Sequence, residues 1–171
     1  MDNKDDAETE MPPGYRFSPT DEELVMYYLK NKVFDKPLPA DVIRDIDASH
    51  IYSSHPKSIV GNSSWVESER YFFIRRDENF NGESKKAQIV GNGIGFWKSV
   101  GEEEPIYNSD GDIFAFKITF IYFSGPVSRP KRTHWRLEEY RLPLESNTND
   151  LKREEWMAAR LLRGSDYNRC V

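Results

Sequence analysis

The chain has 171 residues, of which 37% are hydrophobic and 31% charged, a composition typical of one globular domain with a hydrophobic core. A single cysteine, Cys170, excludes an internal disulfide framework, and three scattered histidines lack the spacing of a zinc site. The net charge of −5 argues against a nucleic-acid partner, but the charge is unevenly distributed. Residues 1–10 carry five acids and one lysine, whereas residues 117–141 carry six basic residues and two acids, which is compatible with a local basic surface.

Both ends of the chain are expected to lie outside one folded domain. Residues 1–10 are predicted to form an acidic disordered tail, residues 11–163 the domain, and residues 164–171 a short C-terminal tail. The N-terminus lacks the basic and then apolar pattern of a secretory signal. The longest apolar run, Ile113 to Phe123, contains a lysine and is too short to span a bilayer. We therefore expect a cytosolic or nuclear protein.

The clearest local signal predicts a helix over residues 20–32. Thr20 is a favourable N-cap residue, and Glu23 completes a capping box with it. Acidic residues in the first turn and lysines in the last turn match the helix dipole. Apolar residues such as Leu24 and Tyr28 recur at helical spacing, which indicates an amphipathic helix with one face on the domain core.

Short elements are predicted in the next part of the chain. Val42 to Ile46 is expected to be extended, Asp47 to Tyr52 to form one helical turn, and Ser53 to Ser64 to be irregular. The aromatic run Arg70 to Arg75 predicts a strand. Asn81-Gly82 predicts a hairpin turn, because this pair readily adopts the positive φ angles of such turns.

Longer strands are predicted in the second half. The elements follow in this order: an acidic turn at Glu102 to Pro105, a hairpin at Asp110-Gly111, a strand with alternating aromatic residues from Phe114 to Tyr122, a basic loop at Ser124 to Thr133, a strand at His134 to Leu142, and a last strand or short helix at Trp156 to Leu162. Two hairpin signals between aromatic strands, with a helix near the start, predict an α+β fold with a mainly antiparallel sheet.

Four blocks of sequence carry a resemblance to a known family. Met11-Pro-Pro-Gly-Tyr-Arg-Phe-Ser-Pro-Thr-Asp-Glu-Glu-Leu24 resembles L-P-P-G-F-R-F-H-P-T-D-E-E-L, the opening block of the plant NAC transcription-factor domain. Tyr71 to Asp77 is similar to Y-F-F-S-P-R-D, Gly95 to Gly101 to G-Y-W-K-A-T-G, and Thr133 to Leu142 to T-N-W-V-M-H-E-Y-R-L. With two weaker matches, the resemblance covers about residues 11–163.

The resemblance implies both a fold and a function. The implied fold is α+β, a strongly twisted antiparallel sheet packed between helical elements. The implied function is sequence-specific binding of double-stranded DNA by a dimeric transcription regulator in the nucleus, with no cofactor, membrane or small-molecule substrate. The partner is expected to be a second copy or another NAC protein. Family salt bridges across the two-fold interface place Arg16 and Glu23 at the dimer interface, with Pro12 in the same block.

The resemblance also assigns candidate DNA-binding residues. In the family, the edge of the W-K-A-T-G strand enters the major groove, and the matching residues here are Trp97, Lys98 and Ser99. The cations that match family positions are Arg76, Arg129 and Arg132. Lys131 adds a charge to the same basic loop, and Lys85 and Lys86 are candidate substitutes for a family arginine that this chain lacks. Two alternatives stay open, because Trp97 also fits a core aromatic residue and the basic loop also fits a solvated turn.

The chain departs from the family pattern at positions that matter for DNA binding. Three carboxylates, Glu102 to Glu104, follow Gly101, where the family has an aspartate and then a lysine, and Val90 stands where it has an arginine. The alternative function is therefore a dimerisation module that binds DNA weakly and sequesters family partners. An enzyme is not expected, because no histidine or cysteine spacing suggests a nucleophile and its base, and the Gly91 to Gly95 segment does not match the dinucleotide-binding pattern.

Overall fold

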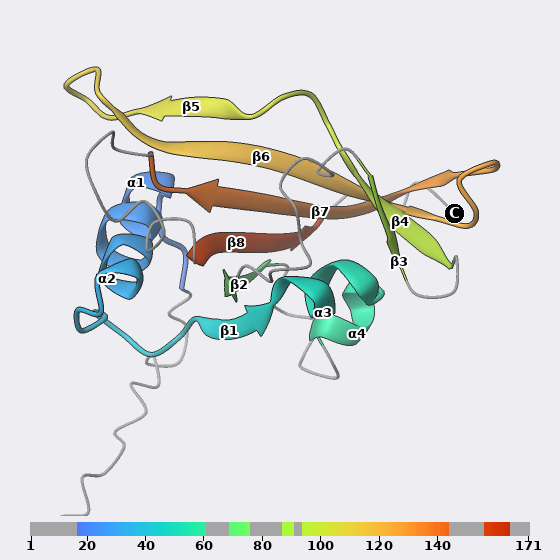
Figure 1. Cartoon of the computed structure of the whole chain (residues 1–171), viewed down its shortest axis with the longest axis horizontal. Helices are drawn as coiled ribbons and strands as arrows, with labels where there is room; N and C mark the ends of the chain where they lie inside the picture. Colours follow the sequence, from blue (N-terminus) through green and yellow to red (C-terminus); the bar gives the residue numbers. More distant parts are fainter. Residues whose placement is uncertain (1–16, 61–68, 76–86, 91–93, 144–155, 165–171) are drawn as a thin grey trace, which may run out of the picture.

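The computed structural model describes residues 17–60, 69–75, 87–90, 94–143 and 156–164. Within these residues, the chain forms one sheet with helical elements packed on both faces (Figure 1). The predicted tails and the predicted hairpin at Asn81-Gly82 lie outside them.

The predicted N-terminal helix is confirmed, together with its capping box. Thr20 Oγ1 accepts a hydrogen bond from the backbone N–H of Glu23 at 3.1 Å, and Glu23 Oε1 accepts one from the N–H of Thr20 at 3.3 Å. The helix has three consecutive parts: α1 (Asp21–Glu23), η1 (Leu24–Leu29) and α2 (Lys30–Val33). The middle part is a π-helical turn, which no sequence signal predicted.

Eight strands form the sheet. They are β1 (Arg44–Asp47), β2 (Glu69–Arg75), β3 (Ala87–Val90), β4 (Gly95–Ser99), β5 (Glu104–Tyr107), β6 (Ile113–Ser124), β7 (Lys131–Arg141) and β8 (Trp156–Arg163). Their order is β1-β2-β8-β7-β6-β4-β3. Strand β5 lies off this path and pairs with the first part of β6, whereas β4 pairs with the last part of β6. Of the described pairs, β1 with β2 is parallel and the others are antiparallel, which confirms the predicted mainly antiparallel sheet.

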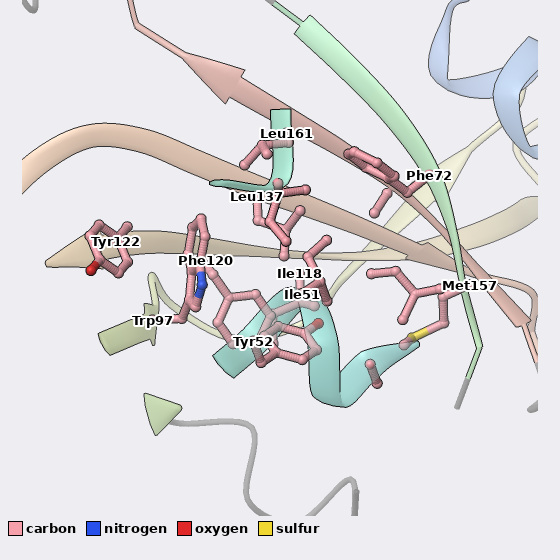
Figure 2. Close-up of a cluster of buried hydrophobic side chains, with 14 residues drawn as sticks. Ile51, Tyr52, Phe72, Trp97, Ile118, Phe120, Tyr122, Leu137, Met157 and Leu161 are labelled. Carbon is pink, nitrogen blue, oxygen red and sulfur yellow. The ribbon is translucent and has the colours of Figure 1, made fainter. Parts of the chain in front are cut away.

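Each face of the sheet has its own hydrophobic core, because successive strand residues point to opposite faces. On one face, α3 (Ala48–Ser53) and α4 (Pro56–Val60) contribute to a cluster with the buried side chains drawn in Figure 2. On the other face, the N-terminal helix packs on Tyr71, Phe73 and Ala158. The sheet is therefore packed between helical elements, as the resemblance implied.

Three predicted segments were wrong in detail. The basic loop is shorter than the predicted Ser124 to Thr133, because β6 ends at Ser124 and β7 begins at Lys131 and not at His134. Residues 56–60 of the predicted irregular stretch form α4: Pro56 occupies its first position, where a missing N–H costs nothing, and His55 Nδ1 accepts from the N–H of Lys57 at 3.0 Å. The predicted acidic turn ends early, because Glu104 and Pro105 belong to β5. Proline is tolerated there because β5 has β6 as its one strand partner in the described structure.

The predicted hairpin at Asp110-Gly111 is confirmed between β5 and β6. Asn108 Oδ1 accepts hydrogen bonds from the N–H groups of Asp110 and Asp112, at 3.0 and 2.9 Å. Gly111 adopts a φ of +84°, which a residue with a side chain rarely adopts. Of the two alternatives for the last element, the strand is correct, whereas β3 had not been predicted.

Candidate nucleic-acid interface

A basic turn joins β6 to β7 at the end of the sheet away from α1 and α2 (Figure 1). Gly125 adopts a φ of +85°, and its N–H donates to the carbonyl of Ile94 at 2.9 Å, which fastens the turn beside the start of β4. The side chains of Arg129, Lys131 and Arg132 are exposed, and none forms an ion pair with another described residue. Three positive charges at this end are therefore not neutralised by described carboxylates.

An irregularity in the β6–β7 ladder separates this turn from the rest of β7. Ile121 pairs with Arg136, whereas Phe123 already pairs with Arg132, so β7 has extra residues here. The Thr133 hydroxyl stabilises the irregular segment by donating to the carbonyl of Tyr122 at 2.6 Å. Beyond this irregular segment, Arg132 and Lys131 pair again with Phe123 and Ser124, so the basic end of β7 remains part of the sheet.

The W-K strand, β4, is anchored by a buried aromatic side chain. Trp97 is 0% exposed and packs edge-on against Tyr122, with ring centroids 5.3 Å apart (Figure 2). A Cβ at Gly95 would lie 2.1 Å from the Tyr122 hydroxyl oxygen, so this close approach requires glycine. The structure thus favours the core interpretation of Trp97, while Lys98 is exposed and Ser99 half-buried.

Sheet register brings a further cation beside Lys98. Ile121 of β6 pairs with Lys98 on one side and with Arg136 on the other, so all three side chains lie on one face. The Arg136 side chain is 50% exposed. The sequence interpretation had not selected it, since the family pattern has valine at this position and the register could not be read from the sequence.

A buried carboxylate, Glu138, lies two residues farther along the same face of β7. Its oxygens lie 2.5 Å from Lys117 Nζ, 3.0 Å from Arg160 Nη2 and 3.3 Å from Arg136 Nε. Burial alone would raise the pKa of Glu138, but the hydrogen bond from Lys117 and the charge of Arg160 outweigh it and hold the pKa below the ordinary value. Glu138 is therefore an ionised group that gathers three cations.

The same carboxylate connects β7 to the N-terminal helix. The Tyr140 hydroxyl lies 3.0 Å from Glu138 Oε2 and 2.8 Å from Asp21 Oδ1. Burial, together with the neighbouring charge of Glu138, raises the pKa of Tyr140, so the hydroxyl stays protonated and donates. Lys117 Nζ also lies 4.0 Å from Asp21. This network fixes α1 to the sheet through charged groups.

The next residue, Glu139, lies on the opposite face of the sheet, and its pKa is shifted in the opposite direction. It is 2% exposed, its neighbours across the ladder are Ile118 and Ala159, and its Oε1 has no hydrogen-bond partner among the described residues. Burial raises the pKa of Glu139 to about 8. This carboxyl group is therefore protonated at neutral pH.

The acidic triplet that follows Gly101 lies away from the basic turn. Glu103 forms a two-point ion pair with Arg141, whereas Glu102 and Glu104 are exposed. Along β6, Glu104 pairs with Lys117, four residues from the partner of Lys98, which is ~13 Å of strand. The triplet is thus displaced from Lys98 in the direction opposite to the basic turn.

Several predicted site residues lie outside the described residues: Pro12, Arg16, Arg76, Lys85 and Lys86. Of the predicted dimer contacts, Glu23 is described and is exposed. The predicted cations that the structure does describe gather at one end of the sheet. In the described parts of the chain, no three His, Cys, Asp or Glu side chains are close enough to hold a metal ion, and no helix has the length and hydropathy needed to cross a membrane.

Comparison with known proteins confirms the resemblance over most of the chain. The family model described as "No apical meristem (NAM) protein" matches residues 12–142. NAC domain-containing protein 101 of Arabidopsis thaliana is 36% identical over 151 residues, which cover 88% of this chain and 42% of the relative. Transcription factor JUNGBRUNNEN 1 of the same plant is 35% identical over 161 residues, covering 92% of this chain and 56% of the relative.

A tomato relative gives the same result. NAC domain-containing protein 2 of Solanum lycopersicum is 32% identical over 168 residues, which cover 94% of this chain and 58% of that protein. The chain thus spans about half the length of these relatives. Both the matched blocks and the fold are accounted for by common ancestry with such proteins. The chain therefore belongs to the NAM family of NAC-domain proteins, a family of transcription factors rather than enzymes.

Proposed function

We propose that this protein is a nuclear transcription regulator that binds double-stranded DNA sequence-specifically as a dimer. One observation carries the proposal: a chain of this family has exposed cations at one end of its sheet. These cations are Lys98, Arg129, Lys131 and Arg132. A duplex presents a dense row of negative phosphates, so a cluster of unpaired cations on a rigid scaffold matches it electrostatically.

The cations of the β6–β7 turn are proposed to contact phosphates. Arg129, Lys131 and Arg132 project from a short turn and the start of a strand, which suits backbone contacts that set register without reading bases. Base reading is assigned to the side chains of β4, where Lys98 and Ser99 are accessible while Trp97 supports the strand from the core. A β-element is narrow enough to enter the major groove.

Other proposed contacts rest on the sequence. Arg76 matches a family arginine, and Lys85 and Lys86 are proposed to substitute for the arginine that Val90 replaces; all three would extend the basic surface. At the dimer interface, the proposed partner of Glu23 is Arg16 of the second copy or of another NAC protein, with Pro12 close by. Because Glu23 Oε1 accepts the capping hydrogen bond, its Oε2 is the oxygen proposed to meet the arginine.

A weakly binding dimer that sequesters family partners is the second candidate. It is favoured by the exposed carboxylates of Glu102 and Glu104 near β4. The ion pair of Glu103 with Arg141 and the displacement of the triplet along β6 support the DNA-binding proposal instead. Reversal of charge by Glu104→Lys separates the two: a large gain in DNA affinity would support the second candidate.

Fluorescence anisotropy tests the proposed function. The purified protein is titrated onto a labelled duplex with the C-G-T core that the family resemblance suggests and onto a scrambled duplex, at 50 and 200 mM salt. We expect a preference for the core duplex that persists at the higher salt, since base contacts depend less on counterion release than phosphate contacts do. A folded dimer with no preference, or with no binding, would refute the proposal.

A further inference from the structure

Arg136 occupies a part of the sheet face that the N-terminal helix does not cover with its described contacts. Alternate residues of β7 on this face are Tyr140, which contacts Asp21 of α1, then Glu138, which is 3% exposed, then Arg136, whose side chain is 50% exposed. Exposure thus increases along the strand toward the basic turn. Arg136 is the first of these residues whose charged group reaches solvent.

The guanidinium of Arg136 is oriented by the buried carboxylate of Glu138. Its Nε lies 3.3 Å from Glu138 Oε1, and its terminal nitrogens have no partner among the described residues. The carboxylate cannot turn away easily, because Lys117 and Arg160 hold it from other sides. An arginine held through Nε presents its outer N–H groups as a fork, which suits a phosphate.

The positive charge of this site is not cancelled by the carboxylates beneath it. Three cations, Lys117, Arg136 and Arg160, surround Glu138, and Asp21 lies within 4.0 Å of Lys117. Three positive charges against two negative charges leave a net charge of +1. Because Arg136 is the most exposed of the three cations, the surplus is directed toward solvent.

We propose that Arg136 is an additional DNA-backbone contact of this chain, acting in one row with Lys98 across Ile121. The inference rests on the proposed function. Cross-strand neighbours lie ~5 Å apart, so Lys98 and Arg136 lie ~10 Å apart on the same face, one on each side of Ile121. The family pattern has valine here, so this contact adds to the family's phosphate contacts and offsets the acidic residues after Gly101.

The test compares Arg136→Gln with Arg44→Gln in the full chain. Arg44 is an exposed strand arginine on β1, the opposite edge of the sheet, and its substitution changes the net charge equally. For Arg136→Gln we expect several-fold weaker binding to both the core and the scrambled duplex. The slope of log affinity against log salt should decrease by about 0.9, so the loss should shrink about three-fold between 50 and 200 mM salt.

The possible results distinguish failure of the role of Arg136 from failure of the proposed function. Equal affinity and slope for the two variants, with wild-type protein binding normally, would overturn the role of Arg136 and leave the proposed function intact. Failure of wild-type protein to bind would overturn both. Arg136→Val, which restores the residue of the family pattern and suits a strand, should reproduce the loss if Arg136→Gln is poorly folded. Arg136→Lys should retain the wild-type slope. Circular dichroism melts verify the folding of each variant.

Discussion

The buried carboxyl group of Glu139 makes the stability of this domain depend on pH in a defined direction. In the folded protein its pKa is about 8, against an ordinary value of 4.5. Between these two pH values the folded state holds a proton that the unfolded state has lost. Stability is therefore highest below pH 4.5 as far as this group is concerned, and decreases as the pH rises through 8.

The size of the effect follows from the same values. The difference between 8 and 4.5, at about 1.4 kcal/mol per pH unit, gives roughly 5 kcal/mol across the interval. Replacement of Glu139 by glutamine keeps the shape and removes the titration. The free energy of unfolding of Glu139→Gln minus that of the wild type should therefore increase as the pH is raised from 5 to 8.

Urea denaturation at pH 5, 6, 7 and 8 measures this difference. Other titrating groups, such as His55, contribute equally to both proteins and cancel in the comparison. Glu104→Gln serves as the control for the loss of one carboxylate, because Glu104 is an exposed strand residue. If the curves of Glu139→Gln and wild type ran parallel to within about 0.5 kcal/mol, the assignment of a protonated carboxyl group in the core would be refuted.

Three other changes have definite expected outcomes. Replacing both Arg129 and Arg132 by alanine should weaken binding to all duplexes and lower the salt slope by about 1.8, as measured by anisotropy; an unchanged slope would contradict the phosphate role. Arg16→Glu or Glu23→Arg should give monomers in sedimentation velocity, and the double reversal should restore the dimer; wild-type protein that sediments only as a monomer would contradict the interface. Gly95→Ala should lower the denaturation midpoint by several degrees, because its Cβ would lie 2.1 Å from a buried hydroxyl oxygen, and an unchanged midpoint would show that β4 can shift freely.

Local signals predicted those parts of the fold that depend on near neighbours in sequence. The capping box at Thr20 and Glu23 was readable because both partners lie in one turn. The alternation from Phe114 to Tyr122 likewise predicted β6 because strand periodicity is a local property. By contrast, the sequence predicts a turn at Glu104 and Pro105, because an acid and a proline disfavour strands, and it is pairing with β6 that makes them the start of β5.

The candidate site was less predictable because it depends on register. Lys98 was selected from its motif, but its neighbour Arg136 lies 38 residues later and meets it only through Ile121. The adjacent residues Glu138 and Glu139 look equivalent in sequence, yet one is held ionised among cations and the other is held protonated in the core. Strand alternation separates them, and the environment on each face decides their charge.

Strand β7 has a geometric consequence for DNA recognition. Its basic end at Arg132 and its attachment to α1 at Tyr140 pair with Phe123 and Lys117 of β6, which are six residues apart, or ~20 Å along the strand. In a dimer joined near α1, the two basic ends would stand at a separation fixed by this strand and not by a flexible linker. The length of the strand would then determine the distance between the two half-sites in a preferred DNA site. Selection of binding sites from random sequence should therefore give a narrow range of half-site spacings.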